Sequence, residues 1–274
     1  HAQYLQPCPE LYDNIISLLK IILTKNSEDH GHILIFLPGT GEIRDLFSRL
    51  TTLFSQNLLP KNCTIHQLYG TLSLNEQRQV LNPTVQTKII LSTNIAETSL
   101  TIDGVRTVID SGLARVSGLN ESGINTLHLQ RISRFSAIQR AGRAGRQGPG
   151  LCYRLWNKQD ELSMRDSEIP EILRMDLSEP LLYLFSQGIT KPLEFGWFER
   201  PNSELLESGT LLLKYLEAIT EDCRLTPIGK KMLNLPLPVR LARIMLAAEE
   251  LNEIYTGAWI CALLAQNSKA SRSP

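Results

Sequence analysis

The sequence predicts an α/β protein, with a parallel sheet covered by helices on both faces and a mainly helical region after it. Short apolar runs alternate with helical patterns over residues 33–156, which is typical of a buried parallel sheet. After about Trp156 strand-like runs become rare and helix-forming residues dominate. The length of 274 residues suits one to two domains of about 100–200 residues each.

The first part is expected to alternate five strands with three helices. The helix at 42–54, for example, carries Ile43, Leu46, Leu50 and Phe54 at helical spacing. Pro38-Gly39 is a turn signal that ends the first strand. The expected strands are 33–37, 64–69, 88–91, 105–109 and 151–156, and the expected helices are 42–54, 74–81 and 132–146.

The second part is expected to be mainly helical, with helices at 171–186, 209–219, 239–250 and 254–265. Another helix begins near Pro227, because proline is favoured at the first helical position. A polar turn at 220–222 and a short extended run at 224–226 precede it. Helix, short β-wing and helix together outline a winged helix, although many all-α domains would give the same pattern. The tail 267–274 is expected to be disordered.

The charge balance excludes a protein that binds nucleic acid as a bulk polycation, because the formal net charge is zero. Any such contact must come from a local cluster. One candidate is the stretch 122–159, which contains no Asp or Glu. It is either a binding patch or a solvated basic face. Its basic residues are Arg131, Arg134, Arg140, Arg143, Arg146, Arg154 and Lys158.

The five cysteines are odd in number and widely separated, with no Cys-x-x-Cys pair, so zinc and redox sites are disfavoured. Free thiols in a reducing cytosol fit best, and we expect a cytoplasmic protein. No signal peptide opens the chain and no apolar run reaches about 18 residues, so no membrane contact is expected. The chain starts at His1, not Met, which suggests a piece of a longer protein.

The segment 139–146 has the composition of an anion clamp. At about 100° per residue, Gln139, Arg143 and Arg146 fall within roughly 60° of one another on a helix, and Arg140 lies off to one side. The residues between them are Ala and Gly only, which let a ligand or another backbone come close. Two guanidinium groups one turn apart would suit the charge that develops on a transferred phosphoryl group.

A second polar segment, 92–104, follows the buried strand at 88–91. Ligands bind at the carboxyl ends of strands in open α/β sheets, and hydroxyls beside a helix N-terminus suit phosphate and ribose. The alternative is a helix cap and turn, which Thr93 and Asn94 would also satisfy.

Together these segments resemble the DEAH-box helicases. The run 93–104 is similar to their motif V and 139–146 to motif VI, while 34–39 and 69–81 resemble motif IV and the short motif after it. All four occur in order with typical spacing. The runs 169–174, 224–229 and 235–242 are similar to the bacterial HrpB-type helicases. The resemblance covers residues 1–265.

The resemblance implies a second RecA-like domain at 1–158, a winged helix at 159–236, and the start of a helical bundle with a tail at 237–274. It implies ATP as cofactor and single-stranded RNA or DNA as partner. Gln139 and Arg143 would face the γ-phosphate, and Arg146 would be a second arginine finger. Its other implied site residues are Ser99, Thr101 and Asp103 near the nucleotide, and Gly39 and Thr93 at the strand. Thr40-Gly41 departs from the acidic or Gln residues of many relatives.

The nucleotide-gripping motifs are absent: no Gly-x-x-x-x-Gly-Lys followed by Ser or Thr occurs, and no Asp-Glu-x-His. In such helicases a preceding RecA-like domain carries them and holds Mg²⁺, so that domain is an expected partner. The alternatives are an RNA-binding scaffold that has lost the motor, and a free-standing ATPase domain. The choice of RNA or DNA stays open.

Several conspicuous side chains are assigned structural roles. His66 and His128 lie in strand-like runs and are expected to be structural rather than ligands. Trp197 and Phe198 could stack on bases, but we expect core packing. Met232 and Met245 are expected in the core, Glu249-Glu250 on a solvated face, and Glu168, Glu171 and Asp176 form no evident carboxylate pair.

Overall fold

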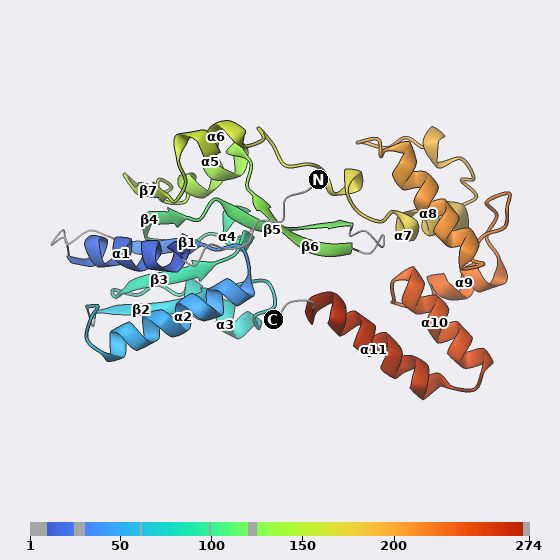
Figure 1. The fold of residues 1–274 in the computed structure, drawn as a ribbon, viewed down its shortest axis with the longest axis horizontal. Coiled ribbons are helices and arrows are strands. Elements are labelled where there is room, and N and C mark those ends of the chain that lie inside the picture. The colour runs from blue at the N-terminus through green and yellow to red at the C-terminus, as the bar shows by residue number, and fades with distance from the viewer. Residues whose placement is uncertain (1–9, 25–30, 61, 99, 120–124, 271–274) are drawn as a thin grey trace. The chain divides into compact units, whose positions relative to one another are not determined.

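A computed structural model describes residues 10–24, 31–60, 62–98, 100–119 and 125–270, with only the backbone of 266–270 (Figure 1). The described chain divides into two compact units. The first contains the residues up to Val116 together with His128–Glu168, and the second contains those of Ser117–Leu127 together with the residues after Glu168.

The first unit is built on a five-stranded sheet in the order β2-β3-β1-β4-β7. Every pairing in this sheet is parallel, which confirms the predicted fold class. The strands are β1 (His32–Phe36), β2 (Cys63–Leu68), β3 (Thr87–Ser92), β4 (Val105–Asp110) and β7 (Leu151–Arg154). They match the five expected strands to within one or two residues at each end.

Both faces of the sheet are buried, as parallel sheets require. Ile33 and Ile35 of β1 belong to a core cluster shared with α1 and α2, whereas Leu34 and Phe36 belong to a second cluster shared with α3 and α4. The helices are α1 (Glu10–Thr24), α2 (Thr40–Ser55), α3 (Leu74–Leu81), α4 (Ile95–Thr98), α5 (Arg134–Gly142) and α6 (Lys158–Ser163). Neither α1 nor α6 was among the expected helices.

A second, two-stranded sheet of β5 (Leu113–Leu119) and β6 (Asn125–Arg131) was not expected from the sequence. These strands follow β4 directly and contribute residues to both units. The part of β5 nearest β4 is fixed by the Arg115 N–H, which donates to the Pro38 carbonyl at 3.2 Å.

The second unit is helical around its own core, which contains Leu181, Leu213 and Met232. An antiparallel bridge joins Ile219 to Leu225 between two helices, as expected for a short wing. Its helices are η1 (Glu171–Leu173), α7 (Ser178–Ser186), η2 (Pro192–Glu194), α8 (Ser203–Tyr215), α9 (Pro227–Leu233), α10 (Val239–Glu250) and α11 (Ile254–Ala270).

The residue types at the start of α9 are explained by the contacts they make there. Pro227 is the first helical residue, and the Thr226 hydroxyl accepts the Gly229 N–H at 3.0 Å. A Cβ on Gly229 would lie 2.1 Å from the Ala218 carbonyl oxygen, so only glycine fits there.

Four expectations for the second unit are wrong. Helix α11 continues to Ala270, into the tail 267–274 that was expected to be disordered. The helix at 171–186 is split at 174–177, because Asp176 accepts the Ser178 N–H at 2.9 Å and donates its own N–H to Asn125 at 3.1 Å. The helix at 209–219 occupies Ser203–Tyr215 instead. Phe198 is fully exposed, whereas Trp197 packs against the core and donates to the Pro192 carbonyl at 2.8 Å.

The domain boundaries at 158/159 and 236/237 stay predictions. The first of them falls inside α6, all of which belongs to the first unit.

Candidate nucleotide and strand site

The polar segments singled out from the sequence follow neighbouring strands of the parallel sheet. The Leu37 N–H, just after β1, donates to the Ser92 carbonyl at the end of β3 at 2.8 Å. The Ser111 N–H, just after β4, donates to the Phe36 carbonyl at 3.2 Å. The loops after β1, β3 and β4 therefore meet at one edge of the sheet, where open α/β proteins bind ligands.

The helix that carries the arginines is shorter than expected. The Ser133 side chain caps α5 by accepting the Ser136 N–H at 3.1 Å, and the helix ends at Gly142 with Arg143 as its C-cap. The expected helix at 132–146 is wrong at its C-terminal end. Arg146 lies beyond the helix, so helical angles alone do not place it on the Gln139 face.

Arg143 is held by the segment that follows β3. Its Nε donates to the Glu97 carbonyl at 2.8 Å and its Nη1 to the Leu100 carbonyl at 2.7 Å, and its Nη2 also donates to the Glu97 carbonyl. Burial lowers the pKa of this guanidinium, and the positive charge of Arg146 lowers it further. All three nitrogens of the Arg143 fork are thus engaged by main-chain oxygens.

Arg146 is exposed and lies near Arg143, as the electrostatic effect of one on the other requires. Both arginines line a small pocket whose other lining residues are apolar: Leu34, Ala96, Leu100, Ile102 and Val105. Two neighbouring guanidinium groups suit a polyanionic group. Gln139 is half-buried on α5.

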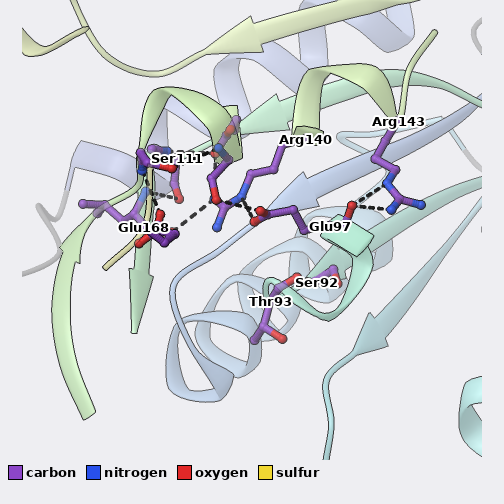
Figure 2. A network of polar contacts seen from close by, with 12 residues as sticks. Ser92, Thr93, Glu97, Ser111, Arg140, Arg143 and Glu168 are labelled. Atoms are coloured by element: carbon purple, nitrogen blue, oxygen red, sulfur yellow. Dashed lines mark hydrogen bonds and ion pairs between the residues drawn. The ribbon is translucent and has the colours of Figure 1, made fainter. Parts of the chain in front are cut away.

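Arg140 differs from both, because its side chain is only 1% exposed. Its Nε donates to the Glu97 carboxylate at 3.0 Å, and its Nη1 donates to Asp110 at 2.9 Å and to the Leu113 carbonyl at 3.2 Å (Figure 2). The guanidinium also lies 4.8 Å from the Phe36 ring centroid. Burial raises the pKa of the Asp110 carboxyl, and the Arg140 charge opposes that shift. Arg140 is therefore a structural cation.

The remaining candidates of the segment after β3 lie in different environments. Thr93 follows β3 and is half-buried, and Thr101 is exposed. Asp103 is exposed and accepts a hydrogen bond from Gln147 Nε2 at 2.6 Å. Gln147 Oε1 in turn accepts the Gly104 N–H at 2.8 Å. This contact links the segment 92–104 to the residues that follow α5. Ser99 lies outside the described residues.

Gly39 is buried at the N-cap of α2, and another side chain fills the space beside it. A Cβ at this position would lie 2.6 Å from Arg115 Nε and 2.9 Å from Glu42 Oε2. The Glu42 and Arg115 side chains form an ion pair at 2.5 Å. A larger residue here would have to displace the ends of the Arg115 and Glu42 side chains, and the Arg115 guanidinium lies beside the position where the sequence suggested a close approach of phosphates.

Most of the acid-free basic stretch is neutralised by residues outside it. Arg131 pairs with Asp160 and Arg134 with Asp166, both at 2.8 Å. Arg154 pairs with Glu161, also at 2.8 Å. Since α6 and the loop after it supply these carboxylates, the stretch is mainly a paired face and not an open basic patch.

Sequence reasoning missed the acidic partners in this site. Glu97 and Asp110 both contact Arg140, and Glu42 contacts Arg115. Glu97 lies inside the segment that resembles motif V. Asp110 ends a buried strand, and an acidic residue at the carboxyl end of an apolar strand is the sequence signal that could have identified it as a partner of a buried cation. Across the part of the chain that the structure describes, no group of three or more His, Cys, Asp or Glu side chains could hold a metal ion.

Two families of helicase domains match the sequence. Residues 13–148 match the helicase conserved C-terminal domain, and residues 210–237 match the winged-helix part of the helicase associated domain, HA2. The matches define the class: the chain belongs to the DEAH-box family of ATP-dependent helicases and carries their C-terminal region.

Within that family the chain is similar to the HrpA and HrpB proteins. It is 37% identical over 271 residues to the ATP-dependent RNA helicase HrpB of Escherichia coli K12, covering 97% of this chain and 32% of that protein. It is 38% identical over 244 residues to the ATP-dependent RNA helicase HrpA of the same organism, covering 87% of this chain and 18% of that protein. The crystal structure of the E. coli DEAH/RHA helicase HrpB aligns with a TM-score of 0.82 and 36% identity, over 93% of this chain and 32% of that one.

The chain thus spans about a third or less of the length of these relatives. None of the described helices is both long and apolar enough to cross a membrane.

Proposed function

We propose that the full-length protein is an ATP-dependent RNA helicase in which this chain supplies arginine fingers and half of the strand-binding groove. Arg146 and Arg143 would stabilise the charge on the transferred phosphoryl group, with Gln139 facing the γ-phosphate. Thr93 and Gly39 would line the strand, and Ser99, Thr101 and Asp103 would lie near the nucleotide. The first RecA-like domain of the same protein would hold Mg²⁺ together with the β- and γ-phosphates.

The observation that carries the proposal is the pair of neighbouring arginines beside the segment that follows β3: Arg143 donates to the Glu97 and Leu100 carbonyls, and Arg146 lines a small pocket with it. A planar fork of donors suits phosphoryl oxygens, and arginine stays charged even when partly buried. When ATP is bound, Arg143 would have to exchange its main-chain carbonyl partners for phosphate oxygens. Closure of the two RecA-like lobes would accompany that exchange and convert loss of the γ-phosphate into motion along the strand.

The decisive experiment is the ATPase activity of the full-length protein with RNA, with DNA and with neither. Turnover stimulated by RNA supports the proposal, whereas stimulation by DNA alone would redirect it to a DNA helicase. A protein that binds RNA but never hydrolyses ATP would favour the alternative, an RNA-binding scaffold that has lost the motor.

Replacing Arg146 with Ala in the full-length enzyme is expected to lower kcat by roughly 10³–10⁵, because arginine fingers act on the transition state. ATP binding should weaken far less. Lysine should not restore turnover, since one ammonium group does not reproduce the planar fork. Arg143→Ala should also lower kcat, and it removes the contacts to the Glu97 and Leu100 carbonyls as well.

Steady-state kinetics on these variants and on Arg154→Ala, an arginine paired with Glu161 away from the pocket, provide the comparison. If Arg143→Ala and Arg146→Ala keep near-normal turnover while folded Arg140→Ala is inactive, the finger assignment is wrong.

A further inference from the structure

Glu97 is the residue through which the segment after β3 contacts α5 and the arginine at its C-cap. It lies in α4, directly after β3, and its side chain is 13% exposed. Its carboxylate accepts the Ser136 hydroxyl at 2.6 Å and Arg140 Nε at 3.0 Å (Figure 2). Its carbonyl accepts Arg143 Nε at 2.8 Å.

The three partners of Glu97 lie at one face of the same helix. Ser136, Arg140 and Arg143 are spaced by four and three residues, which aligns them along a single stripe of α5 and its C-cap. One residue of α4 therefore fixes α5 over its whole length. Arg140 is in turn anchored to Asp110 of β4 at 2.9 Å, so the connection runs through to the sheet.

We propose that Glu97 is a positioning residue that sets where Arg143 and Arg146 stand relative to the nucleotide; this rests on the finger role proposed above. In this role Glu97 would touch neither ATP nor the strand. Its effect comes from the reach of its carboxylate, which spans Ser136 and Arg140 together. When Arg143 leaves the Glu97 carbonyl to meet phosphate, the carboxylate contacts hold α5 in register.

Reach and charge are separable by two substitutions. Glu97→Gln keeps the length: its carbonyl oxygen can accept from Arg140, its amide can donate to the Ser136 hydroxyl, and Asp110 still neutralises Arg140. Glu97→Asp keeps the charge but is one methylene shorter, so it cannot bond both partners. Glu97→Ala loses both. The Glu97 carbonyl remains in all three variants.

The test is steady-state kinetics of the full-length enzyme carrying each of these substitutions. The control is Glu161→Ala, which removes the acidic partner of Arg154 in the same unit. We expect kcat to fall by about 10-fold to 100-fold in Glu97→Ala and Glu97→Asp, within the usual range for coupled neighbours. KM for ATP should stay within about 3-fold, and Glu97→Gln and Glu161→Ala should stay within about 3-fold in kcat.

A double-substitution cycle with Arg146→Ala separates positioning from loss of structure. If Glu97 acts through the fingers, Glu97→Ala should lower kcat further by less than about 3-fold once Arg146 is gone. An equal loss in both backgrounds, or a near-normal kcat in Glu97→Asp, would overturn the positioning role while Arg146→Ala remains inactive. Near-normal turnover in Arg146→Ala itself would instead refute the proposed finger role and remove the premise for Glu97. If Glu97→Ala fails to fold, the comparison of kcat between Glu97→Asp and Glu97→Gln still tests the positioning role.

Discussion

At the scale of single residues, Arg140 and Arg146 show how differently two arginines of one motif are used. Helical spacing already set Arg140 apart from Gln139. The structure explains the difference: Arg140 is buried between the carboxylates of Glu97 and Asp110, whereas Arg146 is exposed and lines the pocket with Arg143. The first holds the domain together, and the second is available to a ligand.

Arg140→Met is therefore expected to act on stability. It leaves the Asp110 carboxylate, 0% exposed, without its cation, and breaking a buried pair in this way typically costs about 3–5 kcal/mol. Chemical denaturation should show a correspondingly lower free energy of unfolding. Adding Asp110→Asn should recover part of the loss, because the uncompensated charge is removed. Equal stability of Arg140→Met and the parent would contradict the structural role.

Arg140 also shows which contacts of a single residue could not be predicted from the sequence. Spacing along α5 indicates which side Arg140 faces, but its partners come from residues 30 and 43 positions earlier. The same holds for Gly39: a glycine after a strand suggests ligand approach, yet the neighbouring Arg115 comes from a strand that the sequence pattern did not predict.

At the scale of elements, β1 and β3 are joined by a contact that we expect to depend on pH. His32 is 9% exposed, and its Nδ1 accepts the Lys88 N–H at 3.3 Å. Burial lowers the pKa of His32 below its ordinary value of 6.5, and the positive charge of Lys88 lowers it further. A protonated imidazole could not accept this hydrogen bond.

The lowered pKa of His32 determines how the free energy of unfolding changes with pH. Well above pH 6.5 the ring is neutral in both the folded and unfolded states, so the His32 contribution to stability is fully present. As pH falls below 6.5 the unfolded chain takes up the proton first, and stability is lost. Unfolding measured from pH 8 to pH 5 should show this loss, reduced in His32→Asn. An unchanged pH profile in that variant would contradict it.

Elements with local signals were predictable, and those fixed by distant contacts were not. Helix α3 has its expected bounds because Ser73 and Glu76 form a reciprocal cap at its start. The 171–186 region reads as one helix, but Asn125 and Ser117, far away in sequence, bind Asp176 and Arg174 and interrupt it. The first four residues of strand β6 alternate between exposed and half-buried, and the strand has no continuous apolar run to reveal it.

At the scale of the whole molecule, the proposed arginine fingers lie in a chain whose sequence lacks the motifs that grip the nucleotide. The described residues include no metal-binding cluster, and the sequence has no phosphate-binding loop. The isolated 274-residue chain is expected to release no phosphate from ATP above background. Adding the first RecA-like domain should restore turnover. Hydrolysis by a clean preparation of the chain alone would reveal a nucleotide site of another kind.

The strand order of the first unit has a consequence for synthesis on the ribosome. Strand β4 pairs with β7, whose last residue, Arg154, follows Asp110 by 44 positions. At about 5–20 residues per second, roughly 2–9 seconds separate the emergence of the two strands. During that interval the edge of β4 has no partner, and its residues Val105, Val108 and Ile109 are apolar. Nascent chains stalled between these strands should therefore be the ones that need a chaperone most.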